Sequence, residues 1–188
     1  MWLIKPVQQI KKRMKAIACV IGILTLWVFT IFTPSWNIDP NYSIKFSGSK
    51  AEGSFTGLTG TIEFDKNQLG NAKMDVSVNA TTINTGNSLK NKHARGESWF
   101  DVTKYPTIKF TSSQFERRAA QFSVMGILEL HGIKKAVTIP FDYIENGRKS
   151  VFNGSFKVNR KDYDINGNIM GFMVGDTFIV TLNIPASK

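Results

Sequence analysis

Residues 80–110 read ATTINTGNSLKNKHARGESWFDVTKYPTIKF, and this stretch says more about the fold than any other part of the chain. It begins with the end of a strand and a turn at residues 84–87, followed by a short polar segment that carries His93 and Arg95. An aromatic pair that begins at Trp99 then leads to a Tyr-Pro step and a new strand. The pattern predicts one short helix inserted between two β-strands.

Short alternating stretches recur on both sides of this helix, which we expect at residues 88–98. They are rich in Val, Ile, Phe and Thr and are separated by Gly, Asn and Asp, as antiparallel strands are. The clearest stretches are residues 59–65, 74–79, 107–113, 121–130, 135–144, 151–159 and 177–185, with weaker ones at 42–46 and 50–55. About eight strands with one helical insertion predict an all-β fold, which is either a closed antiparallel β-barrel or a sandwich.

The alternation also predicts which side chains face the interior. Phe122, Val124, Leu128 and Leu130 share one face of their strand, and such strands bury one face while the other faces water. A barrel of about eight strands is either filled by its side chains or holds one slender ligand. Periodicity leaves both interiors open.

The N-terminal residues differ from the rest of the chain. Residues 1–15 hold five of the 24 basic residues and no acidic one, and residues 16–32 carry no charge. A basic flank before an apolar run is typical of a signal peptide or a membrane-spanning anchor, with the flank left in the cytoplasm. We therefore divide the chain into residues 1–35, a basic flank plus signal peptide or signal anchor, and residues 36–188, the folded domain. No Ala-x-Ala cleavage pattern follows, which favours a retained anchor, and either reading places the domain on the extracytoplasmic, periplasmic face.

Composition gives no sign of several other functions. The net charge of +10 falls to +5 beyond residue 15, where lysines are scattered singly, so the sequence does not indicate nucleic-acid binding. Cys19 is the single cysteine, and His93 and His131 are the only histidines, too few for a metal site. Neither a Gly-x-Ser-x-Gly elbow nor a phosphate-binding or dinucleotide-binding glycine motif occurs, so we expect no enzyme and no catalytic residue.

Several short motifs together resemble the YceI family of secreted bacterial proteins. In chain order the matching motifs are Ile38-Asp39-Pro40, GSFTGLTGTI at residues 53–62, Thr85-Gly86-Asn87, His93, Phe100-Asp101, Tyr105-Pro106, His131-Gly132, Asn159-Arg160-Lys161-Asp162-Tyr163 and Val174-Gly175-Asp176. The resemblance covers residues 39–184. The chain departs from the family at Lys90-Asn91, where many members have Arg-Asp, and at Trp99, which replaces the first of two phenylalanines.

The resemblance implies a lipocalin-like barrel whose hydrophobic channel binds a polyisoprenoid, an isoprenoid quinone or an acyl lipid non-covalently. Burial of each CH₂ of such a tail is worth about 0.8 kcal/mol, so an apolar tube suffices to hold it. The apolar candidates for contact with the tail are Phe46, Ile62, Phe64, Val76, Val78, Trp99, Ile108, Phe110, Phe122, Leu128, Ile139, Phe141, Phe156, Met170, Phe172 and Phe178. His93, Arg95 and His131 are the candidates for contact with the headgroup. The alternative role of the two histidines is hydrogen bonding that fixes the helix (His93) and a hairpin (His131), and the alternative for each apolar candidate is core packing.

We expect no cofactor and no metal. The resemblance makes a lipid the expected ligand, and the N-terminal segment makes the membrane the second expected partner. The alternative function is a packed barrel without a ligand that serves as an extracytoplasmic interaction module. A continuous cavity would argue against that alternative, whereas a closed core of phenylalanines would favour it. The identity of the lipid and the formation of a homodimer stay open at this point.

Overall fold

The computed structural model describes residues 33–167 and 174–188. Residues 1–32 of the expected signal or anchor (residues 1–35), and the tail candidates Met170 and Phe172, lie outside the described residues. Across the described part of the chain, no helix is long and apolar enough to cross a membrane.

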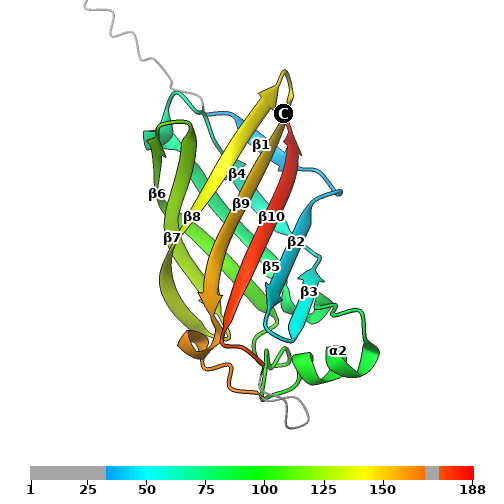
Figure 1. The fold of residues 1–188 in the computed structure, drawn as a ribbon. Helices are drawn as coiled ribbons and strands as arrows, with labels where there is room; N and C mark the ends of the chain where they lie inside the picture. The colour runs from blue at the N-terminus through cyan, green and yellow to red at the C-terminus, as the bar shows by residue number, and fades with distance from the viewer. Residues whose placement is uncertain (1–32, 168–173) are drawn as a thin grey trace, which may run out of the picture. The chain divides into compact units, whose positions relative to one another are not determined.

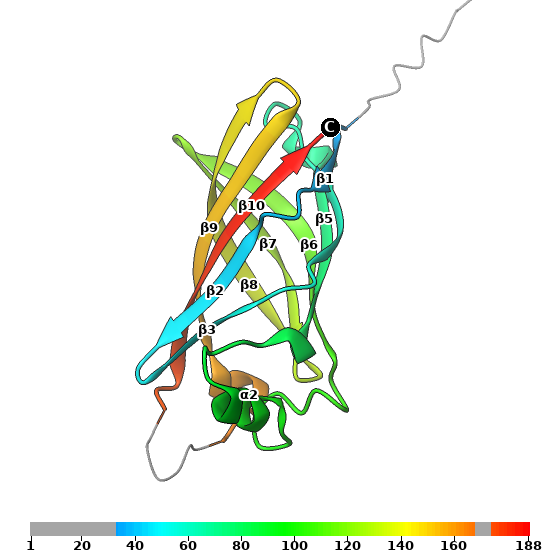
Figure 2. The ribbon, with the colours of Figure 1, turned by 90° about the vertical axis from the view of Figure 1, so that its right-hand side faces the viewer.

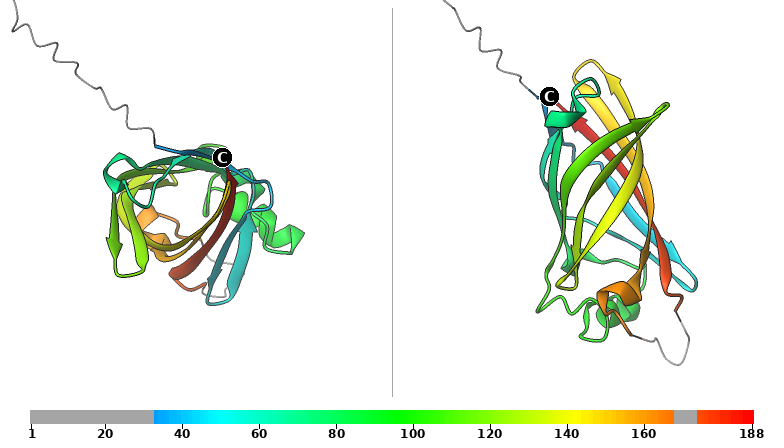
Figure 3. Two further views of the ribbon diagram at one scale, coloured as in Figure 1. Left: turned by 90° about the horizontal axis from the view of Figure 1, so that it is seen from above. Right: turned by 90° about the vertical axis from the view of Figure 1, so that its left-hand side faces the viewer.

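Within those residues, ten strands form one antiparallel sheet that closes into a barrel (Figure 1). The strands are β1 (Ser35–Ile38), β2 (Ser43–Gly48), β3 (Ala51–Phe55), β4 (Thr59–Glu63), β5 (Lys73–Asn79), β6 (Thr107–Arg118), β7 (Gln121–Leu130), β8 (Ile133–Asn146), β9 (Lys149–Asn159) and β10 (Thr177–Ser187). They follow the order β1-β4-β5-β6-β7-β8-β9-β10-β2-β3, and β1 also pairs with β10. The closed wall is visible from above in Figure 3.

The ten strands fill eight positions around the barrel because two positions are each shared by a pair of short strands. One edge of β10 pairs with β2 over most of its length and with β1 at its C-terminal end. On the next position, β3 pairs with β2 and β4 pairs with β1. The predicted closed antiparallel barrel of about eight strands is therefore confirmed.

Helices gather mainly at one end of the barrel. The α-helix α2 (Ser88–Arg95) lies at that end with the 3₁₀-helix η3 (Arg160–Tyr163), as Figure 2 shows. The Asn87 side chain accepts a hydrogen bond from the backbone N–H of Lys90 and so caps the start of α2. Two further 3₁₀-helices are η1 (Leu69–Asn71) and η2 (Ala80–Thr82). The helix is thus confirmed, but it ends at Arg95 rather than at residue 98, because the chain turns at Gly96.

Two strand predictions need correction. β6 continues to Arg118, five residues beyond the predicted end at residue 113, past a register shift between Ser112 and Gln114. An inserted residue of this kind, a β-bulge, reverses the alternation that marks a strand, so the pattern is lost there although the pairing continues. β1 is not among the predicted strands, because four residues are too few to show a period.

Aromatic rings fill the barrel at the end opposite α2, where β1 and the C-terminus lie (Figure 1). The cluster is centred on Phe64, which is wholly buried. Its ring centroid lies 4.8–5.6 Å from five others, and we call these six residues the aromatic cluster: Phe64, Phe115, Phe122, Phe141, Tyr143 and Phe152. The indole Nε1 of Trp36 donates a 2.9 Å hydrogen bond to the Phe64 carbonyl oxygen. This half of the interior is therefore a packed core.

Candidate ligand-binding cavity

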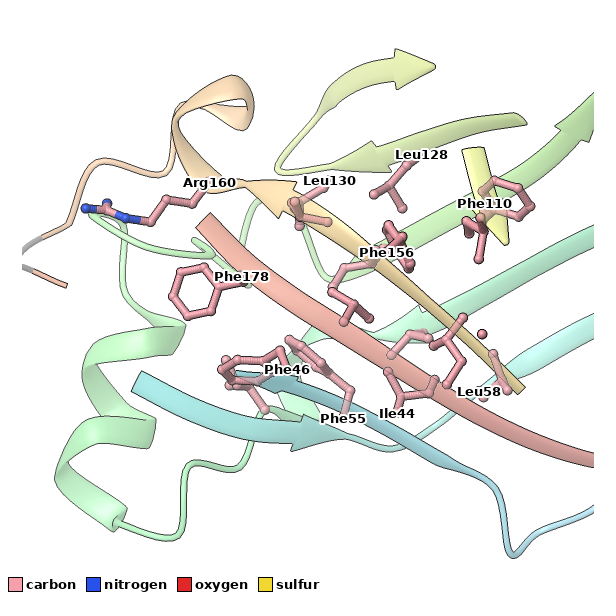
Figure 4. Close-up of a pocket in the computed structure, with 18 of the residues that line it drawn as sticks. Ile44, Phe46, Phe55, Leu58, Phe110, Leu128, Leu130, Phe156, Arg160 and Phe178 are labelled. Carbon is pink, nitrogen blue, oxygen red and sulfur yellow. The ribbon is translucent and has the colours of Figure 1, made fainter. Parts of the chain in front are cut away.

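The other half of the barrel is hollow. A cavity of about 550 Å³ lies between the aromatic cluster and the α2 end, and Figure 4 shows apolar side chains from several strands converging on it. Its volume falls within the range of roughly 300–1,000 Å³ that small-molecule sites occupy. The predicted tail candidates that line it are Phe46, Ile62, Val76, Val78, Trp99, Ile108, Phe110, Leu128, Ile139, Phe141, Phe156 and Phe178.

The alternation of β9 and β10 builds one wall of the cavity in regular steps. Every second residue of β10 from Phe178 to Ile184 lines it, and each is paired with a lining residue of β9, from Val158 to Phe152. The first three pairs are only half-buried although they face the interior, because they border open space. The last of these pairs is Phe152 and Ile184, and the next pair of the same parity, Ser150 and Ala186, does not line the cavity, so this wall of the hollow part ends there.

Polar and charged residues line the cavity at the α2 end. Lys50 lies in the turn between β2 and β3, and Glu52 lies in β3. Thr85 precedes α2, Lys90 is part of α2, and Arg160 begins η3. The side chains of Lys50, Glu52 and Lys90 are exposed to solvent, which identifies this end as the mouth. We call Lys50, Glu52, Thr85 and Lys90 the rim.

Hydrogen bonds hold the segment that carries Thr85 and Lys90 against the barrel. Ser54 of β3 and Asn84 exchange two backbone hydrogen bonds, of 2.8 and 2.9 Å. The Oδ1 atom of Asn91 accepts from both the backbone N–H (2.7 Å) and the hydroxyl (2.8 Å) of Thr85. Asn91 therefore supplies the acceptor here, at a position where many members of the resembling family have an aspartate.

Arg160 is buried at the same end, and its charge is fully engaged within the protein. The guanidinium donates to the carbonyl oxygens of Ile165 (2.7 Å), Gly167 (3.2 Å), Val174 (3.1 Å) and Gly175 (3.2 Å), and its Nη2 lies 3.0 Å from Asp176 Oδ1. A buried charge is costly unless it is paired in this way. Arg160 therefore positions the chain segments around the mouth.

Two of the apolar candidates lie away from the cavity. Phe64 and Phe122 face the interior as expected, but both are packed inside the aromatic cluster and neither lines the hollow part. Alternation assigns a side chain to a face of the sheet and not to a level along the barrel axis. The alternation therefore predicts correctly that Phe64 and Phe122 face the interior, but it does not show that they lie beyond the end of the cavity.

The predicted headgroup residues also lie outside the cavity lining. His93 is exposed on α2, and Arg95 donates from Nε to the Thr81 carbonyl oxygen (2.7 Å) and from Nη2 to that of Ile83 (3.1 Å), which ties α2 to η2. His131 has its Nδ1 atom 3.0 Å from the Tyr163 carbonyl oxygen, and so joins the turn between β7 and β8 to η3.

The rim residues, which do line the cavity, are not predicted by the sequence. Lys50, Glu52 and Lys90 are ordinary exposed charges there, and only the folded barrel brings them to one opening. Thr85 belongs to the Thr85-Gly86-Asn87 motif, and Lys90 follows it closely. Their place in the sequence could therefore have indicated these two residues. No group of three or more His, Cys, Asp or Glu side chains able to hold a metal occurs among the described residues.

These features define a class of protein: a small antiparallel β-barrel that encloses a blind, apolar cavity with a charged mouth. A model of the YceI-like domain matches residues 36–186, and the chain therefore belongs to the YceI family. The resemblance read from the sequence is confirmed.

Individual relatives agree with this assignment. Protein YceI of Shigella flexneri is 30% identical over 132 residues, which cover 66% of this chain and 69% of that protein. A UPF0312 protein of Yersinia pestis (strain Pestoides F) is 31% identical over 148 residues, which cover 78% and 73% respectively. Each comparison spans more than two thirds of the relative.

Solved structures share the fold at lower identity. BcnA of Burkholderia cenocepacia superposes with a TM-score of 0.74 at 21% identity, covering 80% of this chain and all of that one. A polyisoprenoid binding domain from Saccharophagus degradans, implicated in plant cell wall breakdown, gives a TM-score of 0.62 at 12% identity and covers 83% and 99%. At these identities the likeness concerns the fold alone.

Proposed function

We propose that this protein binds a long-chain isoprenoid or a similar amphiphilic lipid in its barrel, and sequesters or carries it. The observation that supports the proposal most strongly is the cavity of about 550 Å³ with apolar walls and a charged mouth. The Saccharophagus relative, described as a polyisoprenoid binding domain, adds support through its shared fold. The mechanism is encapsulation, in which no covalent bond is made or broken.

The walls suit a tail without specific polar groups. Each CH₂ moved from water into the cavity contributes about 0.8 kcal/mol, so a tail of several isoprenoid units is held by burial alone. The polar end of the lipid would lie at the rim, where the lysines and Glu52 remain hydrated. This arrangement argues for the carrier over the packed barrel without a ligand, because half of the interior is unfilled.

We also propose that the protein acts outside the cytoplasm, beside a membrane. The support comes from the sequence, where the basic residues 1–15 precede the uncharged residues 16–32. A retained anchor would raise the local concentration of the barrel near its lipid source. Protease protection of the tagged chain in whole cells and spheroplasts would test this location.

A pair of tryptophan substitutions on adjacent residues tests the binding site. Val180 faces the cavity, whereas Ile179 points to the outer face and is 45% exposed. We expect Val180→Trp to fill the channel and to reduce lipid uptake at least tenfold, about 1.4 kcal/mol of binding free energy. Ile179→Trp adds the same ring to the outside and should bind as the natural protein does.

The readout is the amount of polyprenol, isoprenoid quinone or fatty acid that co-purifies with the full-length chain after incubation with each lipid. Uptake by the Val180→Trp variant equal to that of the natural chain would place the ligand outside the cavity. A natural chain that takes up none of these lipids would overturn the carrier proposal and favour the interaction module.

A further inference from the structure

We propose that Phe152 is a length-determining residue, which sets the longest lipid tail that the cavity accepts. The inference rests on the proposed lipid-binding function and concerns the same cavity. It follows from how the cavity ends, since a channel closed at one end by a rigid wall limits what can enter it.

Along the wall made by β9 and β10, the last residues that line the cavity are the cross-strand pair Phe152 and Ile184. Gly154 and Leu182, the pair one step nearer the mouth, also line the cavity, whereas Ser150 and Ala186, the pair one step beyond, do not. From Phe178 at the mouth end to Ile184 the wall extends about 20 Å along β10, at roughly 3.4 Å per residue. A straight tail that enters at the rim therefore meets the Phe152 ring.

The wall behind Phe152 leaves the tail no further path. The Phe152 ring is 5.6 Å from that of Phe64 and 6.3 Å from that of Trp36, both of which are buried. On the outer side, Lys188 Nζ lies 4.2 Å from the centroid of the Trp36 ring. Packed interiors of this kind yield little, so a longer tail must leave part of its length in water at the mouth.

The consequence is a limit on chain length. Each isoprenoid unit adds affinity as long as it fits between the rim and Phe152, and units beyond that limit add nothing. Removal of the Phe152 ring would open space up to Trp36, the next wall. We expect the preferred tail to lengthen by at least one isoprenoid unit.

Phe115 supplies a matched control for this substitution. It is a phenylalanine of the same aromatic cluster, 6% exposed, and its ring lies 5.6 Å from Phe64, the same distance as that of Phe152. It does not line the cavity. Phe115→Ala should thus cost comparable stability without a change in the tail length that the protein selects.

The experiment offers the full-length chain an equimolar ladder of polyprenols, then re-isolates the protein and measures the bound lengths by extraction and mass spectrometry. Phe152→Ala is expected to move the distribution to longer tails, and Phe115→Ala to leave it unchanged. A third variant, Leu182→Trp, adds a ring one step nearer the mouth and is expected to move the distribution to shorter tails. If Phe152→Ala does not fold, an unchanged distribution in Leu182→Trp would still overturn the inference.

The outcomes separate this inference from the function on which it rests. If the natural chain binds polyprenols but the folded Phe152→Ala or Leu182→Trp variant selects the same lengths, the length-determining role is wrong and the carrier stands. That role is equally wrong if Phe115→Ala lengthens the tail as much as Phe152→Ala. If the natural chain binds no polyprenol at all, the proposed isoprenoid cargo fails, and the length-determining role fails with it.

Discussion

The guanidinium of Arg160 lies 5.2 Å from the ring of Trp99, and together these residues join η3 to the segment that follows α2. Gly167 packs against the indole of Trp99, while its carbonyl oxygen accepts a hydrogen bond from Arg160. The mouth of the cavity is thus framed by side chains whose own positions are fixed by several contacts. Such support keeps an opening in shape when no ligand fills it.

Arg160→Lys tests this framework because it keeps the charge and removes the planar donor array. Several buried carbonyl oxygens would lose their donor, and we expect the free energy of unfolding to fall by about 2–3 kcal/mol. Urea denaturation followed by circular dichroism measures the loss. Arg95→Lys is the control, since Arg95 also donates to two backbone carbonyls but is exposed, and it should cost less than about 1 kcal/mol. Equal losses of unfolding free energy for the two variants would show that the buried hydrogen bonds of Arg160 stabilise the protein no more than the exposed ones of Arg95.

Gly167→Ala tests the contact with Trp99 directly. A Cβ atom at this position would overlap the indole and approach the Ser98 carbonyl oxygen to 2.6 Å, so the indole must move. We expect a loss of about 1–3 kcal/mol together with a shift in tryptophan fluorescence. Gly70→Ala places the same methyl group in open space and should change stability by no more than about 0.5 kcal/mol. An unchanged Gly167→Ala protein would mean that the indole is not held there.

Two phenylalanine truncations test the division of the barrel into a packed half and a hollow half. Phe64 is surrounded by rings, and Phe64→Ala should cost about 3–5 kcal/mol. Phe178 borders the cavity, and its ring already lacks neighbours on one side, so Phe178→Ala should cost less than half as much in protein freed of lipid. Similar losses from denaturant unfolding would contradict a hollow mouth half.

Glu145 gives the stability a defined dependence on pH. The hydrogen bond from Lys188 Nζ (2.8 Å), assisted by Lys66 Nζ at 3.3 Å, lowers the pKa of the Glu145 carboxyl below its ordinary value of 4.5. A carboxyl whose pKa is lower in the folded state than in the unfolded state stabilises the protein. This stabilisation is fully present at pH values above the pKa of the unfolded state, and it is lost as the pH falls through the pKa of the folded state. Glu145→Gln should therefore be less stable than the natural chain near pH 7 by up to about 1 kcal/mol.

The two proteins should converge in stability at a pH well below 4.5, where the carboxyl of the natural chain is protonated. Thermal or urea unfolding at a series of pH values measures the difference. A gap that stays constant from neutral pH to the acid limit would mean that the charge of Glu145 contributes nothing.

The sequence predicts the face that each side chain takes but not its depth. Phe64 and Phe110 both point inward, yet one lies in the aromatic cluster and the other lines the cavity. Alternation repeats every two residues and carries no information on the axial level, which depends on strand tilt and register. The bulge between Ser112 and Gln114 hides the end of β6 for a related reason, since it reverses the alternation.

The predicted headgroup residues lie outside the cavity lining for a different reason. His93, Arg95 and His131 are candidates because of their residue type and their place in the motifs. The rim is made instead by Lys50, Glu52, Thr85 and Lys90, whose proximity depends on the pairing of β2 with β3 and on the bonds between Ser54 and Asn84. The family resemblance, in contrast, rests on motifs spread along the domain. Those motifs are sufficient to identify the barrel and the family without any geometry.

Whether the hollow half of the barrel holds a lipid can be tested on the protein as its host makes it. The full-length chain is purified from that host without added lipid and extracted with organic solvent, and what it carries is identified by mass spectrometry. We expect close to one isoprenoid or acyl lipid per chain, and its loss from the Val180→Trp variant but not from Ile179→Trp. Protein that is repeatedly empty, and that stays empty when polyprenols, quinones and fatty acids are supplied, would contradict the proposed function.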